Sequence, residues 1–116
     1  MQTETSAMAG LGDGPVVLGP APAVDELELA AVLHALSDPI RLRIVGRLAD
    51  VSELCCGGFD LPITKSTCSH HFRVLREAGV ISQRVEGKNK LNVLRRDELD
   101  ARFPGLLDAV LDASDV

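Results

Sequence analysis

Aromatic residues are scarce in this sequence, which has three Phe and neither Trp nor Tyr. The hydrophobic core must therefore be built from Leu, Val, Ile and Ala, a set that suits packed helices. Hydrophobic residues still make up 46% of the chain and charged residues 25%, which is typical of a globular fold rather than a disordered one. A length of 116 residues leaves room for one domain with one core.

Cysteine, long apolar runs and basic residues near the start are also sparse or missing. The odd count of three Cys is no disulfide framework. No apolar run approaches the roughly 20 residues of a membrane span, and Met1-Gln2-Thr3-Glu4 lacks the basic region of a secretory signal. We therefore expect a cytoplasmic protein with no membrane partner. No nucleophile–base arrangement, phosphate loop or complete metal site is recognisable, so we do not expect an enzyme.

The charge of the chain is unevenly distributed. The formal net charge is −5, yet the segment 64–96 holds eight basic residues against two acidic ones, and the rest of the chain holds four against fifteen. A compact basic segment in an acidic protein indicates a local phosphate-binding face, although a solvated charged surface would give the same pattern.

The order of elements follows from apolar periodicity and from residues that begin or end helices. Residues 1–23, rich in Gly, Ala, Pro, Ser and Thr, are predicted to be a flexible tail, and residues 24–113 a single domain. In that domain the patterns predict helices from Asp25, over 39–50, briefly over 52–56, over 65–78, and over 97–103 and 104–111, with strands over 80–85 and 90–94. The predicted fold is mainly α with one β-hairpin, in the order α-α-α-α-β-β-α.

The helix predicted over 65–78 has two distinct faces. At 100° per residue its apolar side chains, such as Cys68, Phe72 and Leu75, share one face, which must pack on the core. The opposite face is small and polar at its start and carries a cation one turn later, as a DNA recognition helix requires. This face and its flanks comprise Ser66, Thr67, Ser69, His70, Arg73 and Glu77. An ordinary amphipathic surface helix would have similar faces.

A basic β-hairpin follows that helix directly, as the wing follows the recognition helix in a winged helix-turn-helix. Arg84, Lys88 and Lys90 would reach the phosphate backbone or the minor groove, and such contacts carry affinity rather than sequence choice. The helix, the hairpin and the charge distribution together favour a DNA-binding winged helix-turn-helix.

Two segments carry a resemblance to a known family. Leu33-His34-Ala35-Leu36-Ser37-Asp38-Pro39-Ile40-Arg41-Leu42-Arg43-Ile44-Val45 resembles the ALSDPTRLRIL stretch of ArsR/SmtB repressors. The run from Lys65 to Ile81 is similar to the recognition element of that family, and Glu86-Gly87-Lys88 to its wing turn. The likeness covers about residues 25–112.

The resemblance implies a homodimer joined through the first and last helices, which places two recognition helices on an inverted-repeat operator in double-stranded DNA. The base-reading positions of the family fall on Lys65, Ser66, Thr67, Ser69 and His70. Such repressors release DNA on a chemical signal, so a transition metal or arsenite is an expected effector.

The sensing sites of relatives are incomplete in this sequence. Cys55 and Cys56 are adjacent, without the third Cys of the arsenic sensors, and the last helix has Asp residues but no His. Cys55 and Cys56 are still the best candidates for soft-metal binding or thiol oxidation, although a buried Cys is more often a small apolar residue. A co-regulatory protein could supply the signal instead. The alternative function is a winged-helix module that contacts proteins without binding an operator.

Overall fold

The computed structural model describes residues 16–17, 21–51, 54–55, 63–87 and 89–114. Its helical elements are η1 (Val24–Glu26), α2 (Leu29–Ala35), α3 (Pro39–Asp50), α4 (Lys65–Ala78), α5 (Arg96–Arg102) and α6 (Leu106–Ser114), and its strands are β1 (Val16–Val17), β2 (Leu54–Cys55), β3 (Ile81–Glu86) and β4 (Asn89–Leu94). The predicted mainly helical fold with one hairpin is confirmed. Along the described stretches, no helix is long and apolar enough to cross a membrane.

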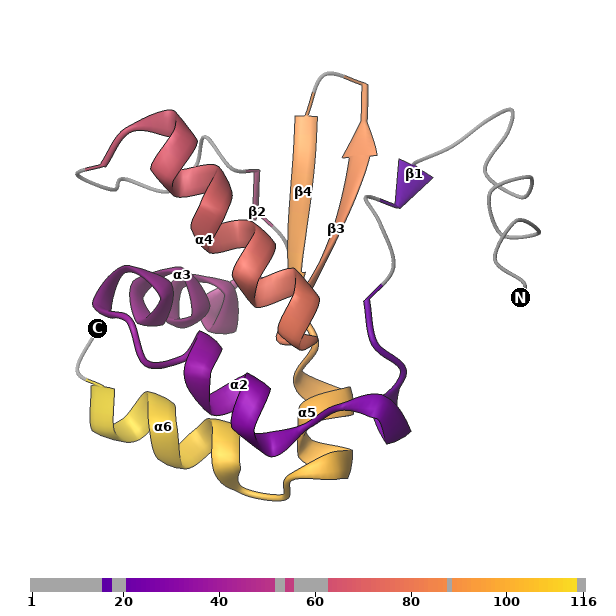
Figure 1. The fold of residues 1–116 in the computed structure, drawn as a ribbon, viewed down its shortest axis with the longest axis vertical. Coiled ribbons are helices and arrows are strands. Elements are labelled where there is room, and N and C mark those ends of the chain that lie inside the picture. The colour runs from indigo at the N-terminus through magenta and orange to yellow at the C-terminus, as the bar shows by residue number, and fades with distance from the viewer. Residues whose placement is uncertain (1–15, 18–20, 52–53, 56–62, 88, 115–116) are drawn as a thin grey trace.

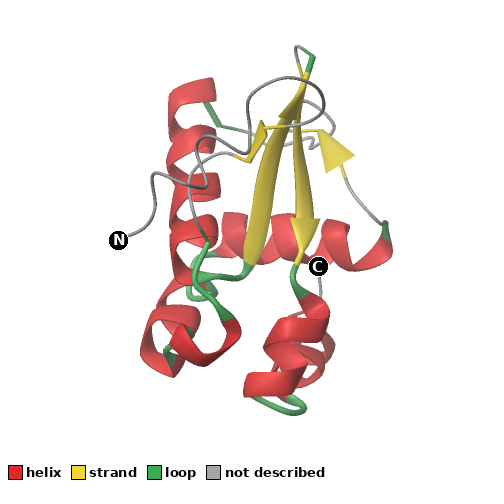
Figure 2. Ribbon diagram, turned by 90° about the vertical axis from the view of Figure 1, so that its right-hand side faces the viewer, coloured by secondary structure: helices red, strands yellow, loops and turns green. Residues whose placement is uncertain are grey.

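The β3–β4 hairpin extends away from α5 and α6, so that its turn lies at the far end of the molecule (Figures 1 and 2). Glu86 pairs with Asn89, and Gly87 has a φ of 65° at the turn between them. The hairpin is the centre of a four-stranded sheet in the order β1-β3-β4-β2. The wing therefore has short strands on both of its edges.

One local prediction is wrong. The segment predicted as a short helix over 52–56 instead contains the strand β2, in which Leu54 pairs with Asn92 and Cys55 with Leu91. The apolar run is too short to form a stable helix before Gly57-Gly58, and the free edge of β4 offers backbone partners that a sequence pattern cannot show. Ser52 and Cys56 lie outside the described residues.

Two further differences concern the first part of the chain. Val16–Val17, inside the segment predicted to be a flexible tail, pairs antiparallel with Val85 and Arg84 of β3. The helix predicted from Asp25 is divided into η1 and α2, because Leu27 and Glu28 have extended backbones between them. The core side chain of Leu27, which is 1% exposed, occupies this break.

The helices α3 and α4 begin where the sequence predicted. Asp38 caps α3 by accepting hydrogen bonds from the N–H groups of Ile40 and Arg41 at 2.8 and 3.1 Å, and Pro39 is the first helical residue. The apolar face of α3, with Ile44, Val45 and Leu48, is fully buried. It packs with residues of α4, β3, α5 and α6 in a single core.

Arg41 joins three helices inside the protein. Its Nε donates to the carbonyl of Ala35 at 2.7 Å and its Nη2 to that of His34 at 3.3 Å, which gives these C-terminal carbonyls of α2 hydrogen-bond partners. Its Nη1 lies 3.0 Å from Nδ1 of His71 on α4. An Arg can only donate, so Nδ1 of His71 is the acceptor and this ring is neutral with its proton on Nε2.

Burial is the largest influence on His71 and lowers its pKa below the ordinary value of 6.5. The carboxylate of Asp38 raises this pKa, whereas the charges of Arg41 and His70 lower it. Asp38 lies 3.9 Å from Nδ1, too far for a hydrogen bond. Burial alone would raise the pKa of Asp38, but the N–H groups of Arg41 and Ile40 outweigh it and hold the pKa below 3.8. The charged carboxylate and the neutral imidazole thus stabilise the junction between α3 and α4.

Gly79 ends α4 and connects it to the wing. Its φ of 88° is left-handed, and the N–H of Val80 donates back to the carbonyl of Leu75 at 2.9 Å. A Cβ at this position would overlap Cδ2 of Leu27. The turn from α4 into β3 therefore requires a glycine for two separate reasons.

Replacing Gly79→Ala should lower the free energy of unfolding by about 2 kcal/mol or more, because a left-handed backbone and a core overlap both penalise the methyl group. Urea denaturation measures this change. Gly105→Ala is the matched control, since its φ is 82° but a Cβ there meets open space. Equal losses in the two variants would show that the contact with Leu27 costs nothing.

The neutral His71 predicts that stability falls on acidification. The unfolded chain binds the proton at a higher pH than the folded chain, so the free energy of unfolding should decrease as pH falls below about 6.5, by at most about 1.4 kcal/mol per pH unit. The contribution of Asp38 is lost only at lower pH, as its carboxylate becomes protonated.

His71→Asn keeps an acceptor near Nδ1 but does not titrate, so it should flatten this dependence in urea denaturation between about pH 7.5 and 5.5. An equal flattening in a variant of the exposed His34, His34→Asn, would contradict the assignment to His71.

Candidate nucleic-acid interface

The exposed face of α4 carries the polar residues that the helical wheel placed there. Thr64 precedes the helix, and its Oγ1 accepts from the N–H of Thr67 at 3.3 Å. Ser66, Thr67, Ser69, His70 and Arg73 are all exposed. The start of α4 therefore presents small hydroxyl groups beside the backbone N–H groups of the first turn, and an imidazole and a guanidinium follow within about two turns.

The opposite face of α4 is buried, as predicted. Phe72 is 3% exposed and Leu75 is fully buried. Cys68 is half-buried and packs against the same core. The separation of the two faces leaves the polar face of α4 accessible while the helix is anchored along its length.

The register of the hairpin decides which wing residues face α4. Val85 pairs with Lys90 and Gln83 with Asn92, whereas Arg84 pairs with Leu91. Paired residues share a face of the sheet and neighbours along a strand alternate, so Lys90 lies on the face of Gln83 and Arg84 on the other.

A depression runs between α4 and this face of the wing. We call it the helix–wing depression, and its lining residues are Ser66, Ser69, His70, Arg73, Arg76, Gln83 and Lys90. It brings together five of the predicted DNA-binding residues. Arg84 is on the other face of the hairpin, Thr67 is exposed beside the depression, and the side chain of Lys65 and all of Lys88 lie outside the described part of the structure.

Sequence reasoning missed a chain of polar side chains at the base of this depression. Nη1 of Arg76 donates to Oε1 of Gln83 at 3.1 Å, and Nε2 of Gln83 donates to Oδ1 of Asn92 at 2.7 Å. Gln83 is 5% exposed and Asn92 is fully buried. In the sequence, Gln83 lies midway between Ile81 and Val85, and Asn92 midway between Lys90 and Leu94. Because side chains alternate along a strand, each is a polar residue on the same face as its two flanking residues, and this was the signal that could have revealed them.

The histidines take different roles. His70 is exposed on the face predicted to read bases, and its ring centroid lies 5.6 Å from that of the buried His71. The side chain of His34 is exposed, while its carbonyl accepts from Arg41 and from the hydroxyl of Ser37. His71 therefore supports α4 from within.

The candidate sensing cysteines are only partly described. Cys55 belongs to β2, where it pairs with Leu91 of β4, and Cys56 is outside the described residues. Among the side chains that the structure does place, no three His, Cys, Asp or Glu residues are grouped as a metal ion would require.

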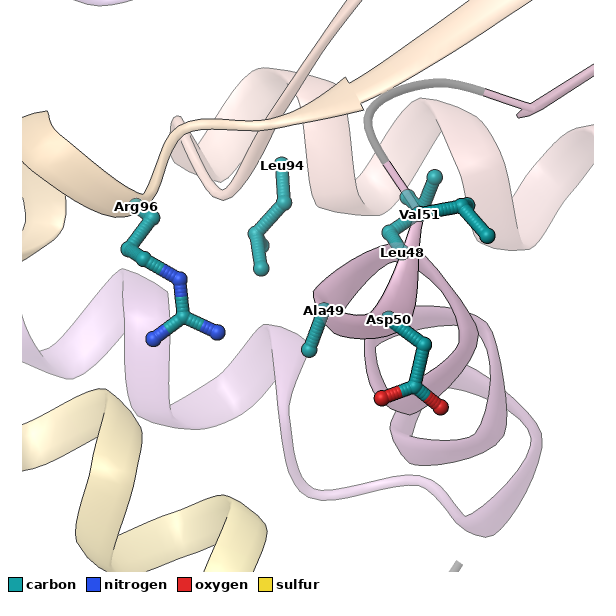
Figure 3. A pocket seen from close by; sticks show the side chains of 6 residues that line it. All are labelled: Leu48, Ala49, Asp50, Val51, Leu94 and Arg96. Carbon is teal, nitrogen blue, oxygen red and sulfur yellow. The ribbon is translucent and has the colours of Figure 1, made fainter.

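A second depression lies at the end of α3, just before β2. It is lined by Leu48, Ala49, Asp50, Val51, Leu94 and Arg96, and Figure 3 shows Asp50 and Arg96 on different sides of it. Nη1 of Arg96 lies 3.1 Å from Oδ1 of Asp108 on α6, so this guanidinium already has an anionic partner. The charge of Arg96 therefore joins α5 to α6.

Comparison with known proteins gives the same assignment as the geometry. The family model described as "Bacterial regulatory protein, arsR family" matches residues 38–83, from the cap of α3 into β3. The chain is 38% identical over 89 residues to the HTH-type transcriptional regulator YceK of Bacillus subtilis (strain 168), covering 74% of this chain and 89% of the relative.

Two further relatives have names that describe their roles. A "Biofilm growth-associated repressor" of Agrobacterium fabrum is 34% identical over 102 residues, which is 84% of each chain. A "Cadmium resistance transcriptional regulatory protein CadC homolog" of Staphylococcus aureus is 39% identical over 64 residues, 53% of each chain. The polar face of α4, the adjoining wing and these matches lead to one conclusion: the chain belongs to the arsR family of bacterial regulatory proteins and is a DNA-binding transcriptional regulator.

Proposed function

We propose that this regulator represses transcription by inserting α4 into the major groove of an inverted-repeat operator in double-stranded DNA. The observation that carries the proposal is the helix–wing depression, in which the polar face of α4 and a wing cation line the same space. His70 and Arg73 can donate to guanine O6 and N7, and the hydroxyls of Ser66, Thr67 and Ser69 allow a close approach. Lys65 belongs to the same first turn and completes the proposed contact set.

The wing supplies contacts to the sugar-phosphate backbone in this proposal. Lys90 is exposed beside α4, and the predicted contacts of Arg84 and Lys88 would extend this contact along the hairpin. Such contacts strengthen binding to every sequence and weaken as salt rises. The division of labour is therefore base reading by α4 and electrostatic anchoring by the wing.

A homodimer through α2 and α6 would place two such helices on the two halves of an operator. Leu29 and Leu33, one turn apart on α2, are 47% and 44% exposed. Apolar side chains that lie on one face of a helix and are this accessible are expected to be covered by a partner. A second copy would bury them and reproduce the symmetry of an inverted repeat.

The release signal is proposed to act through β2. Because Cys55 pairs with Leu91 in β4, metal binding or oxidation at Cys55 and Cys56 would disturb a strand that belongs to the wing. The name of the cadmium-resistance relative supports a metal as the signal. Thiol oxidation and a co-regulatory protein are the competing sources of the same change.

The proposed reading of bases is tested with His70→Ala and Lys90→Ala on a duplex that the protein itself enriches from a random DNA pool. His70→Ala should reduce discrimination between this duplex and random DNA by roughly 1–3 kcal/mol, because a base contact is lost. Lys90→Ala should weaken both complexes alike and lower the slope of log affinity against log salt by about one. Fluorescence anisotropy at several salt concentrations measures both effects.

Equal losses of His70→Ala on both DNAs would remove His70 from the base readers. Failure of the protein to enrich any duplex would favour the protein-contact module instead. If two chains bind a full inverted repeat and removal of one half-site abolishes tight binding, the dimer is supported; unchanged binding to a half-site contradicts it.

The sensing proposal is tested by titrating the reduced protein–DNA complex with zinc, nickel, arsenite and then a mild oxidant. If Cys55 and Cys56 sense the signal, one of these agents should lower the affinity, and a Cys55→Ser/Cys56→Ser variant should abolish the response. Cys68→Ser is the matched control, because this thiol lies on the core side of α4. Binding that is indifferent to every agent would assign the signal to a partner protein.

A further inference from the structure

Three side chains from three elements form a continuous polar link beneath the proposed DNA-binding surface. Arg76 lies in the last turn of α4, Gln83 in β3 and Asn92 in β4, and hydrogen bonds of 3.1 and 2.7 Å join them in that order. Gln83 and Asn92 are directly opposite each other in the hairpin. The link therefore connects the recognition helix to both strands of the wing.

The link lies beside the residues that are proposed to contact DNA. Arg76 and Gln83 line the helix–wing depression together with His70 and Arg73 on one side and Lys90 on the other. Lys90 is two residues before Asn92 on the same face of β4. A change in the length or angle of the link would move Lys90 relative to the base-reading face of α4.

The hydrogen bonds of the link define the distance between α4 and the wing more closely than apolar packing would. Apolar side chains attract without direction, whereas hydrogen bonds require set distances and angles. Nε of Arg76 is buried without a hydrogen-bond partner in the described part of the chain, which costs stability. The arrangement accordingly favours a defined helix-to-wing geometry over maximal stability.

Arg76 itself is poorly placed to be a DNA contact. Its side chain is 19% exposed, and its guanidinium is engaged with Gln83 and lies 3.9 Å from the carboxylate of Glu77. Arg73, one turn earlier, is exposed on the same side of the helix and available for that role.

We propose that Arg76, Gln83 and Asn92 are positioning residues that hold the wing at a fixed distance and angle from α4. In this arrangement Lys90 meets its backbone phosphate only while α4 is seated in the groove. The inference rests on the proposed DNA contacts and adds that the helix and the wing bind as one rigid unit.

The test is a double-mutant cycle between the link and Lys90, measured by anisotropy on the duplex enriched by the protein. In the parent, Lys90→Ala should weaken binding by about threefold or more and lower the salt slope by about one. In a Gln83→Met background, which keeps the side-chain volume but removes both hydrogen bonds, Lys90→Ala should weaken binding by less than about 1.5-fold and leave the slope unchanged.

Arg76→Leu is the second variant, because it cuts the link from α4 and leaves the Gln83–Asn92 pair intact within the hairpin. It should reduce the effect of Lys90→Ala in the same way, and it serves if Gln83→Met does not fold. Ser82→Ala is the matched control, since position 82 lies on the opposite face of β3. Thermal unfolding confirms that each variant is folded at the assay temperature.

Smaller effects of Lys90→Ala in every link variant that folds, with the full effect kept in Ser82→Ala, support the proposal. If the effects of the link variants and of Lys90→Ala on binding are additive, the link is wrong but the proposed interface stands. A residue that only stabilises the fold, or that contacts its own phosphate, does not change the contribution of Lys90. If Lys90→Ala has no effect even in the parent, both the wing contact and the link are wrong.

Discussion

The guanidinium of Arg41 joins α4 to α2 and α3 through directional hydrogen bonds. It donates to the last carbonyls of α2 and to His71 in the middle of α4, while its own backbone N–H helps Asp38 to cap α3. Arg41 is only 7% exposed, and a buried charge is tolerated only when its donors are satisfied in this way. The two helices of the helix-turn-helix and the helix before them therefore share one set of directional bonds.

Polar contacts of this kind occur along the length of α4. His71 is bound to Arg41 near its middle, Arg76 is bound to Gln83 in its last turn, and Gly79 follows with a backbone that only glycine adopts without strain. Phe72 and Leu75 lie between these contacts and are buried in the core. The hydrophobic effect holds α4 on the core, and the polar contacts determine how it is rotated and how far it lies from the wing.

The ends of helices α3 and α4 could be predicted from the sequence, because capping residues and a glycine mark them. Asp38-Pro39, Thr64 and Gly79 mark helix ends through side-chain capping and backbone preference, and α3 and α4 have the predicted bounds. The strand β2 could not be predicted, because it depends on the edge of β4, which is distant in sequence. The pairing of Val16–Val17 with β3 was missed for the same reason.

The candidate site could likewise be predicted from the sequence only in part. The exposed face of α4 follows from its periodicity alone, so the exposure of Ser66, His70 and Arg73 was predicted correctly. The separation of Arg84 from Lys90 depends on which face of the hairpin packs toward α4, a property of the tertiary structure. The link from Arg76 to Asn92 likewise requires three elements to be placed before its members can be seen to touch.

The structure also changes the meaning of the basic segment. At least three of its cations already interact with other residues of the protein: Arg76 with Gln83, Arg95 with the carbonyl of Gly79 and the carboxylate of Glu98, and Arg96 with Asp108. Counting charges along residues 64–96 therefore overstates the number available to phosphates. The exposed cations of the helix–wing depression are Arg73 and Lys90. Because the protein is acidic and these cations are few, its attraction to DNA depends on their positions as well as on their number. The geometry that holds the wing beside α4 therefore matters as much as the charge itself.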